Sequence, residues 1–343
     1  MEIMPGLIDS AAILRTQAGT DSIHRDFRAG KLVRIRRGFY VSTPEWLRAR
    51  PSERFAWSTT AVARSVKGAV LCGETAALAN GLPTLRTPAF VELATTLPGR
   101  SGTRRSPLLV LGEESAAKEV RETRSYPLRY RLRTTVEPVV QGEFRCTGLI
   151  QTAVDVMVSS KLSQALVVAD GLARRLHDEG ILATDANLLA VADISDGLAA
   201  HPFGAARRRA EQVARLASPL AESVGESYSR AAFEFLGFEQ PVLQHQLRDD
   251  DGFIGRSDCW WPEYGVVGEF DGKAKYVDAG IRGDLTAEEA VYREKLREDR
   301  IRALGYGFFR WSWSDVDNPE RLRRKLLSAG LRPRNPRAPG NRL

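Results

Sequence analysis

The feature that most constrains the fold lies late in the chain, where two apolar runs flank a short turn-like segment. Residues 253–261 and 266–271 have the character of strands, and the residues between them, Pro262-Glu263-Tyr264-Gly265, are typical of a turn. If the hairpin closes symmetrically on that turn, Asp258 stands opposite Glu269. Directly opposed side chains have Cβ atoms about 5 Å apart. The sequence therefore predicts two carboxylates that face each other across a β-hairpin.

A divalent cation would resolve the repulsion between two such carboxylates. Mg²⁺ commonly binds one or two carboxylates, together with water and phosphate oxygens. Asp258 and Glu269 are therefore the predicted metal ligands, with Mg²⁺ or Mn²⁺ as the expected cofactor. Asp271 and Lys273 share a face with Glu269 if the strand stays extended, and a lysine there can orient water or stabilise developing phosphoryl charge. The alternative is that these alternating polar residues only face solvent.

A further acidic residue, Glu226, precedes the hairpin on a predicted helix. Its spacing from Ser223 fits a capping box, in which the two side chains satisfy backbone N–H groups at the helix start. Its position also suits a third acid of the predicted site. The sequence leaves these two roles equally open.

The order of these elements resembles the PD-(D/E)XK nuclease fold, and within it the branch similar to very-short-patch-repair endonucleases. The resemblance covers roughly the last 120 residues and rests on Glu269-Phe270-Asp271-Gly272 and on the later run DRIRALGYGFFRWSWSDV. It implies a metal-dependent endonuclease in which Asp258 and Glu269 hold metal and Glu226 is the acid of the first helix. The chain departs from the pattern at Asp271, where the family has lysine. The lysine role then passes to Lys273 or Lys275, or is absent.

The first fifty residues predict a winged helix-turn-helix. Two short helices, over residues 7–19 and 20–30, lead into a basic hairpin over residues 31–42. The second helix would lie in a DNA groove and the hairpin would contact phosphates. The alternative is a plain solvated surface. The predicted DNA-binding residues are Ser22, His24, Arg25, Arg28, Lys31, Arg34, Arg36 and Arg37.

Two stretches resemble AbiEi-type antitoxins of type IV toxin–antitoxin systems. They are AGKLVRIRRGFYV near the start and VLCGETAALANGLPT in the middle region. The resemblance implies a domain that binds DNA at its own promoter, a scaffold or partner-binding middle region, and a nucleotidyltransferase toxin as partner. It also suggests a link to phage defence.

The expected fold class is therefore a multidomain α/β protein. We predict a winged helix-turn-helix (residues 1–50), an AbiEi-like α+β domain (51–200), a basic helical linker (201–221), a PD-(D/E)XK domain (222–328) and a disordered basic tail (329–343). A net charge of +7 over 343 residues indicates a polyanionic partner, most simply double-stranded DNA.

Neither a membrane-length apolar run nor a signal peptide is apparent, so we expect no membrane partner and a cytoplasmic location. Three isolated cysteines argue against a disulfide framework or a structural zinc site. The sequence favours a DNA-binding endonuclease, with a non-catalytic antitoxin-like autorepressor as the second hypothesis and a purely structural or toxin-binding protein as the third.

Overall fold

The computed structural model describes residues 5–13, 17–112, 114–201, 204–272 and 287–334. These residues form a mixed α/β chain with several small sheets, which divides into two compact units, Met1–Val156 and Met157–Leu343. The expected domain limits at residues 50 and 200 fall inside these units.

The first unit opens with a small three-stranded sheet of order β1-β3-β2. Its elements are β1 (Ile8–Asp9), α1 (Ser10–Ile13), α2 (Gln17–Arg28), β2 (Leu32–Arg36) and β3 (Phe39–Ser42). The predicted basic hairpin is confirmed, because Leu32 pairs with Ser42 and Gly38 turns the chain with a φ of 85°. The break expected between the two helices at residues 19 and 20 is wrong, since α2 runs unbroken from Gln17 to Arg28, and Ile8 and Asp9 pair with β3 as a third strand.

The core beneath this hairpin includes side chains from beyond residue 50. Val33 and Ile35 of β2 pack with Trp57 of α4 (Pro51–Ser65) and Val120 of α6 (Glu114–Glu122). Arg34 also exchanges two backbone hydrogen bonds with Leu109, of 2.7 and 3.0 Å. The hairpin is therefore part of a larger core rather than a separate module. The short α3 (Thr43–Arg48) completes this layer.

The rest of the first unit is built on a second sheet of order β4-β6-β5 and on a two-stranded ribbon. Val91 and Leu128, from neighbouring parallel strands, pack against Phe55 of α4. Strands form in the apolar runs AFVELAT and YRLRTTV, whereas in the similar run SPLLVLG the described pairing is the isolated bridge at Leu109. The elements are α5 (Gly73–Ala79), β4 (Val91–Thr95), β5 (Gly102–Arg104), β6 (Leu128–Leu132), β7 (Pro138–Gln141), β8 (Phe144–Thr147) and α7 (Leu149–Ser159).

The second unit begins with helices that anchor the site-bearing sheet. A buried ion pair joins two of them, because Arg230 Nη1 lies 2.8 Å from both carboxylate oxygens of Asp170. An unpaired charge at this depth would be strongly destabilising, so loss of either partner should loosen the packing of α11 on α8. The helices are α8 (Leu162–Asp178), α9 (Ala192–Ala199), α10 (Gly204–Leu216) and α11 (Val224–Phe235).

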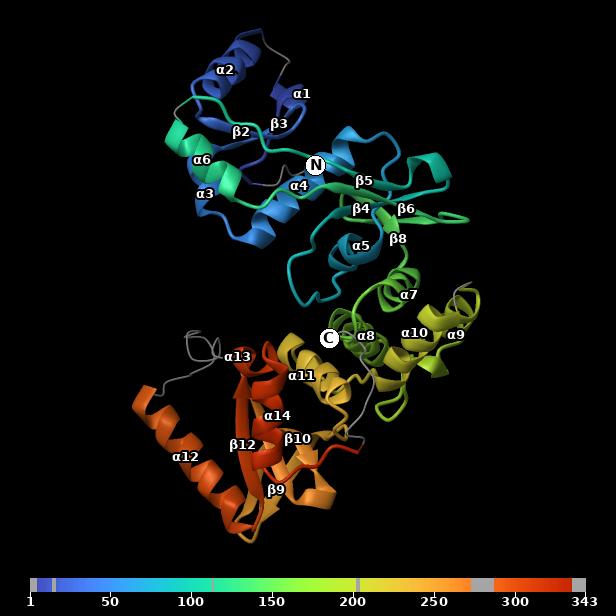
Figure 1. Ribbon diagram of the computed structural model, residues 1–343, viewed down its shortest axis with the longest axis vertical. Helices are drawn as coiled ribbons and strands as arrows, with labels where there is room; N and C mark the ends of the chain where they lie inside the picture. The colour runs from blue at the N-terminus through green and yellow to red at the C-terminus, as the bar shows by residue number, and fades with distance from the viewer. Residues whose placement is uncertain (1–4, 14–16, 113, 202–203, 273–286, 335–343) are drawn as a thin grey trace. The chain divides into compact units, whose positions relative to one another are not determined.

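A four-stranded sheet of order β12-β11-β10-β9 follows α11. The strand β10 is antiparallel to both of its neighbours, β9 and β11, and β12 lies parallel to β11. The chain order is helix, three strands, helix, strand (Figure 1). The elements are β9 (Val242–Asp249), β10 (Gly252–Trp261), β11 (Val266–Asp271), α12 (Ala287–Ala303), β12 (Gly307–Ser312), α13 (Trp313–Val316) and α14 (Pro319–Ser328).

The last strand ends one residue earlier than the aromatic run suggests. Trp313 begins α13 instead of continuing β12, because Ser312 and Asp315 form a capping box there.

Among the helices of the described residues, none combines the length and apolar character that crossing a membrane requires.

Candidate functional site

The hairpin that carries the predicted acids closes as the sequence indicates. A single 3₁₀ turn, Pro262–Tyr264, and Gly265 with a φ of 57° reverse the chain. Cys259 pairs with Gly268 and Trp261 with Val266, so the next position of the ladder places Asp258 opposite Glu269. The predicted register is confirmed for the paired residues, of which Cys259 and Gly268 are the last, one position before the two acids.

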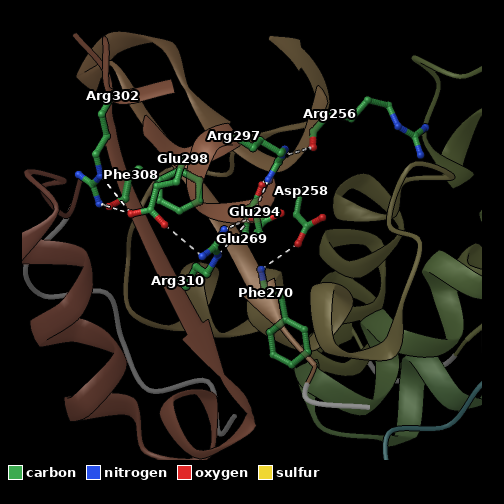
Figure 2. A network of polar contacts seen from close by, with 10 residues as sticks. All are labelled: Arg256, Asp258, Glu269, Phe270, Glu294, Arg297, Glu298, Arg302, Phe308 and Arg310. Atoms are coloured by element: carbon green, nitrogen blue, oxygen red, sulfur yellow. Dashed lines mark hydrogen bonds and ion pairs between the residues drawn. The ribbon is translucent and has the colours of Figure 1, made fainter. Parts of the chain in front are cut away.

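Three carboxylates from this hairpin line one pocket of about 260 Å³. One oxygen of Asp258 accepts a hydrogen bond of 2.8 Å from the backbone N–H of Phe270, which anchors its carboxylate beside β11 (Figure 2). Acidic and guanidinium groups are therefore mixed in one cavity. The lining residues are Arg256, Asp258, Glu269, Phe270, Asp271, Gly272, Glu294, Arg297 and Arg310.

Two arginines hold the carboxylate of Glu269, whose side chain is 14% exposed. Arg297 of α12 lies 2.5 Å from Oε1, and Arg310 of β12 lies 3.3 Å from Oε2. Burial, the largest single effect, would lower the pKa of the Arg297 guanidinium, but the hydrogen bonds and charges of Glu269 and Glu294 together outweigh it and raise that pKa. The charge of Glu269 is thus balanced within the protein.

The arginines also bind the acids of α12, which makes the cluster a network (Figure 2). Arg297 lies 3.1 Å from Glu294, and Arg310 lies 3.1 Å from Glu298 and also contacts Glu294. Charge-assisted hydrogen bonds of this kind are stronger than neutral ones, so they orient the guanidinium groups at the pocket wall.

The donor set suits a hard cation, although no group of three or more metal-binding side chains is gathered in the described part of the chain. Asp258 and Glu269 supply oxygen ligands, and Mg²⁺ often takes one or two carboxylates with water completing its shell. For Glu269 to bind a cation, at least one of its arginine contacts would have to be exchanged.

Glu226 has the contacts of a helix cap. Its Oε1 accepts a hydrogen bond of 2.7 Å from Ser223 Oγ, and its Oε2 accepts one of 2.9 Å from the backbone N–H of Glu222. It is not among the residues that line the pocket. Of its two predicted roles, the capping role is the one with visible contacts. The predicted residue Lys273 and its alternate Lys275 lie outside the described residues.

The N-terminal candidates divide into two groups. Arg36 donates a hydrogen bond to Ser65, and burial lowers the pKa of its guanidinium, while Arg34 lies 5.2 Å above the ring of Phe27. Ser22 is half-buried. The exposed candidates are His24, Arg25, Arg28, Lys31 and Arg37, of which Lys31 also pairs with Asp26 at 3.8 Å.

Sequence reasoning missed three of the pocket residues, Arg256, Glu294 and Arg297. The last two lie three residues apart on α12, in a run of alternating charges that is equally typical of a solvated helix face. One weak sequence signal of a close neighbour was the glycine at position 255 within a strand. Its φ is 157°, and a Cβ added there would lie 2.8 Å from Arg297 Nε.

Comparisons of the chain with protein-family models, with curated proteins and with solved structures found no match.

Proposed function

We propose that the second unit is a divalent-metal-dependent hydrolase of DNA phosphodiester bonds. The observation that carries the proposal is the joint lining of one pocket by Asp258, Glu269 and Asp271 and by three arginines. Carboxylates attract a cation, and guanidinium groups bind phosphate oxygens in pairs. In metal-assisted hydrolysis of a phosphodiester, the cation and the guanidinium groups both stabilise negative charge on the phosphate.

The order of helix, three strands, helix and strand supports a PD-(D/E)XK-like core as part of this proposal. Asp258 and Glu269 would hold the cation, which supplies an activated water and polarises a phosphoryl oxygen when bound. Arg297 and Arg310 would turn from Glu269 to the entering phosphate. When the two arginines move to the phosphate, the Glu269 carboxylate would become available to the cation. The same arginines would then stabilise the negative charge that develops on the phosphate.

The first unit supports binding of double-stranded DNA in this proposal. Its exposed cationic side chains on α2 and the β2–β3 turn, among them Arg25, Arg28 and Arg37, suit contacts with the phosphate backbone. Such contacts position a protein on DNA without reading sequence, so they would serve either a nuclease or a regulator.

A second candidate function is a non-catalytic antitoxin-like autorepressor with a nucleotidyltransferase toxin as partner. Two observations favour its non-catalytic character. Asp271 occupies the position where the nuclease pattern has lysine, and Glu269 is held by two arginines in the free protein. In this case the protein would bind DNA and leave it intact.

Plasmid cleavage with Mg²⁺ or Mn²⁺ separates the two functions. We expect the wild type to nick or linearise DNA and both Asp258→Asn and Glu269→Gln to abolish cleavage. The matched control is Glu263→Gln, which makes the same chemical change at an exposed position of the same hairpin turn and should cleave normally. Wild-type protein that leaves plasmid intact with both metals, while still retarding it in a gel, would replace the hydrolase with the repressor.

A further inference from the structure

A second basic surface of this unit lies between the strand β12 and the helix α14. The groove has a volume of about 600 Å³, and no carboxylate is among its lining residues in the described chain. Four of those residues are cationic. Its principal lining residues are Phe308, Phe309, Arg310, Arg321, Arg324 and Lys325.

A buried acid, Asp315, holds two of the cations that line the groove. Asp315, whose side chain is 1% exposed, lies 2.6 Å from Arg321 and 2.9 Å from Lys325. Lys325 also donates a hydrogen bond of 3.1 Å to the backbone carbonyl of Arg310. One carboxylate thus fixes two cations along the end strand of the sheet, and Arg324 adds a third charge.

The charge of the groove is positive beyond what Asp315 compensates. Three cations of α14, Arg321, Arg324 and Lys325, line the groove, and Asp315 offsets the charge of one. A surface of this kind attracts a polyanion and is screened by salt. Phe308 is only 8% exposed, so it offers little ring surface on which a base could stack.

The groove lies next to the pocket that contains Asp258 and Glu269. Arg310 lines both, and it contacts Glu269 on one side while its backbone carbonyl meets Lys325 on the other. A chain of phosphates that crosses the groove would therefore arrive at the pocket next to Arg310.

We propose that the β12–α14 groove binds the phosphodiester backbone of duplex DNA beside the bond that enters the pocket. The proposal rests on the proposed function, since it gives the groove the same substrate. The groove contacts phosphates and not base edges, so its contribution is independent of sequence and depends steeply on salt.

The test measures binding without cleavage. A fluorescent duplex of about 20 base pairs is titrated by anisotropy between 50 and 200 mM salt, with Asp258→Asn as the background. Each lost phosphate contact lowers the salt slope by about 0.9, so adding Arg321→Gln/Arg324→Gln should reduce the change in Kd over this fourfold salt range by a factor of about 12. Arg324→Gln alone leaves the Asp315 contacts intact and should reduce it by a factor of about 3.5.

The control is Lys161→Gln/Arg175→Gln, which removes the same charge from exposed positions near α8. Groove variants whose slope equals that of this control, or a parent protein that does not retain the duplex, would overturn the groove proposal. A single-stranded probe bound more tightly than the duplex, or a polyglutamate peptide bound in its place, would also overturn it.

The plasmid assay stays independent of this result. A protein that cleaves but shows no slope change has an active site without this groove. One that shows the slope change but never cleaves has the groove without hydrolysis.

Discussion

Gly225, in the first turn of α11, should not tolerate a methyl group because Phe270 of β11 packs against it. An added Cβ would lie 2.0 Å from one ring carbon of Phe270 and 2.5 Å from another. Phe270 is 7% exposed and meets Trp313 edge to face at 5.3 Å, so its ring has little room to move. A relaxation of a few tenths of an ångström cannot relieve this contact.

The expected cost follows from two opposing terms. Alanine in place of glycine favours a helix by up to about 1 kcal/mol, and overpacking a core costs about 1–3 kcal/mol. Since the overlap here is severe, we expect Gly225→Ala to destabilise the second unit by about 1–2 kcal/mol. With Phe270→Ala, which by itself costs about 3–5 kcal/mol, the same change should be neutral or slightly stabilising.

Native-state hydrogen exchange of the amides in α11 and β11 reports the stability of this unit alone. The two single variants, the double variant and the wild type form a double-mutant cycle, which isolates the contact between the two positions. A Gly225→Ala protein that is as stable as wild type, or a cost that persists unchanged without the Phe270 ring, would refute the reasoning. The backbone N–H of Phe270 also anchors Asp258. Gly225→Ala should therefore weaken plasmid cleavage if it displaces Phe270.

Two further predictions concern the charged groups. Arg297→Gln removes a charge-assisted bond to Glu269 and should lower the free energy of unfolding by about 1.5–3 kcal/mol. The substitution also makes the pocket more negative, so calorimetry should find tighter Mn²⁺ binding. An unchanged Mn²⁺ affinity would contradict the idea that Arg297 competes with a cation for Glu269. Burial alone would raise the pKa of Asp315, but hydrogen bonds from Lys325 and Ser312 outweigh it and lower that pKa. The stabilisation by Asp315 is therefore present above the ordinary aspartate pKa of about 3.9 and is lost as the pH falls below it. Denaturant titrations from pH 7 to pH 3 should show that Asp315→Asn costs stability mainly at the upper end, and an equal cost at both ends would refute this sign.

The parts of the fold that depend on local chain geometry could be predicted from the sequence. The register of Asp258 against Glu269 followed from the length of the turn, because a short reversal leaves few ways to pair two strands. The basic hairpin followed in the same way from Gly38. Neither prediction needed a contact between distant residues.

What the sequence did not reveal depends on such distant contacts. Ile8 and Asp9 are a strand only because β3 offers them an edge, and their own residues favour a helix start equally well. Arg297 becomes a partner of Glu269 because α12 passes the end of β11, 28 positions earlier in the chain. Charge alternation within α12 gives no sign of which arginine turns inward.

The shared core of the N-terminal hairpin has a consequence for biosynthesis. Val33, Val41 and Trp46 are completely buried, and the cluster that covers them includes Val110, Ala117 and Val120. In a nascent chain that has emerged from the ribosome only as far as residue 50, these apolar side chains remain exposed to solvent. The hairpin should therefore gain protease resistance only after the segment around residue 120 has emerged, and a peptide cut at residue 50 should remain unstructured.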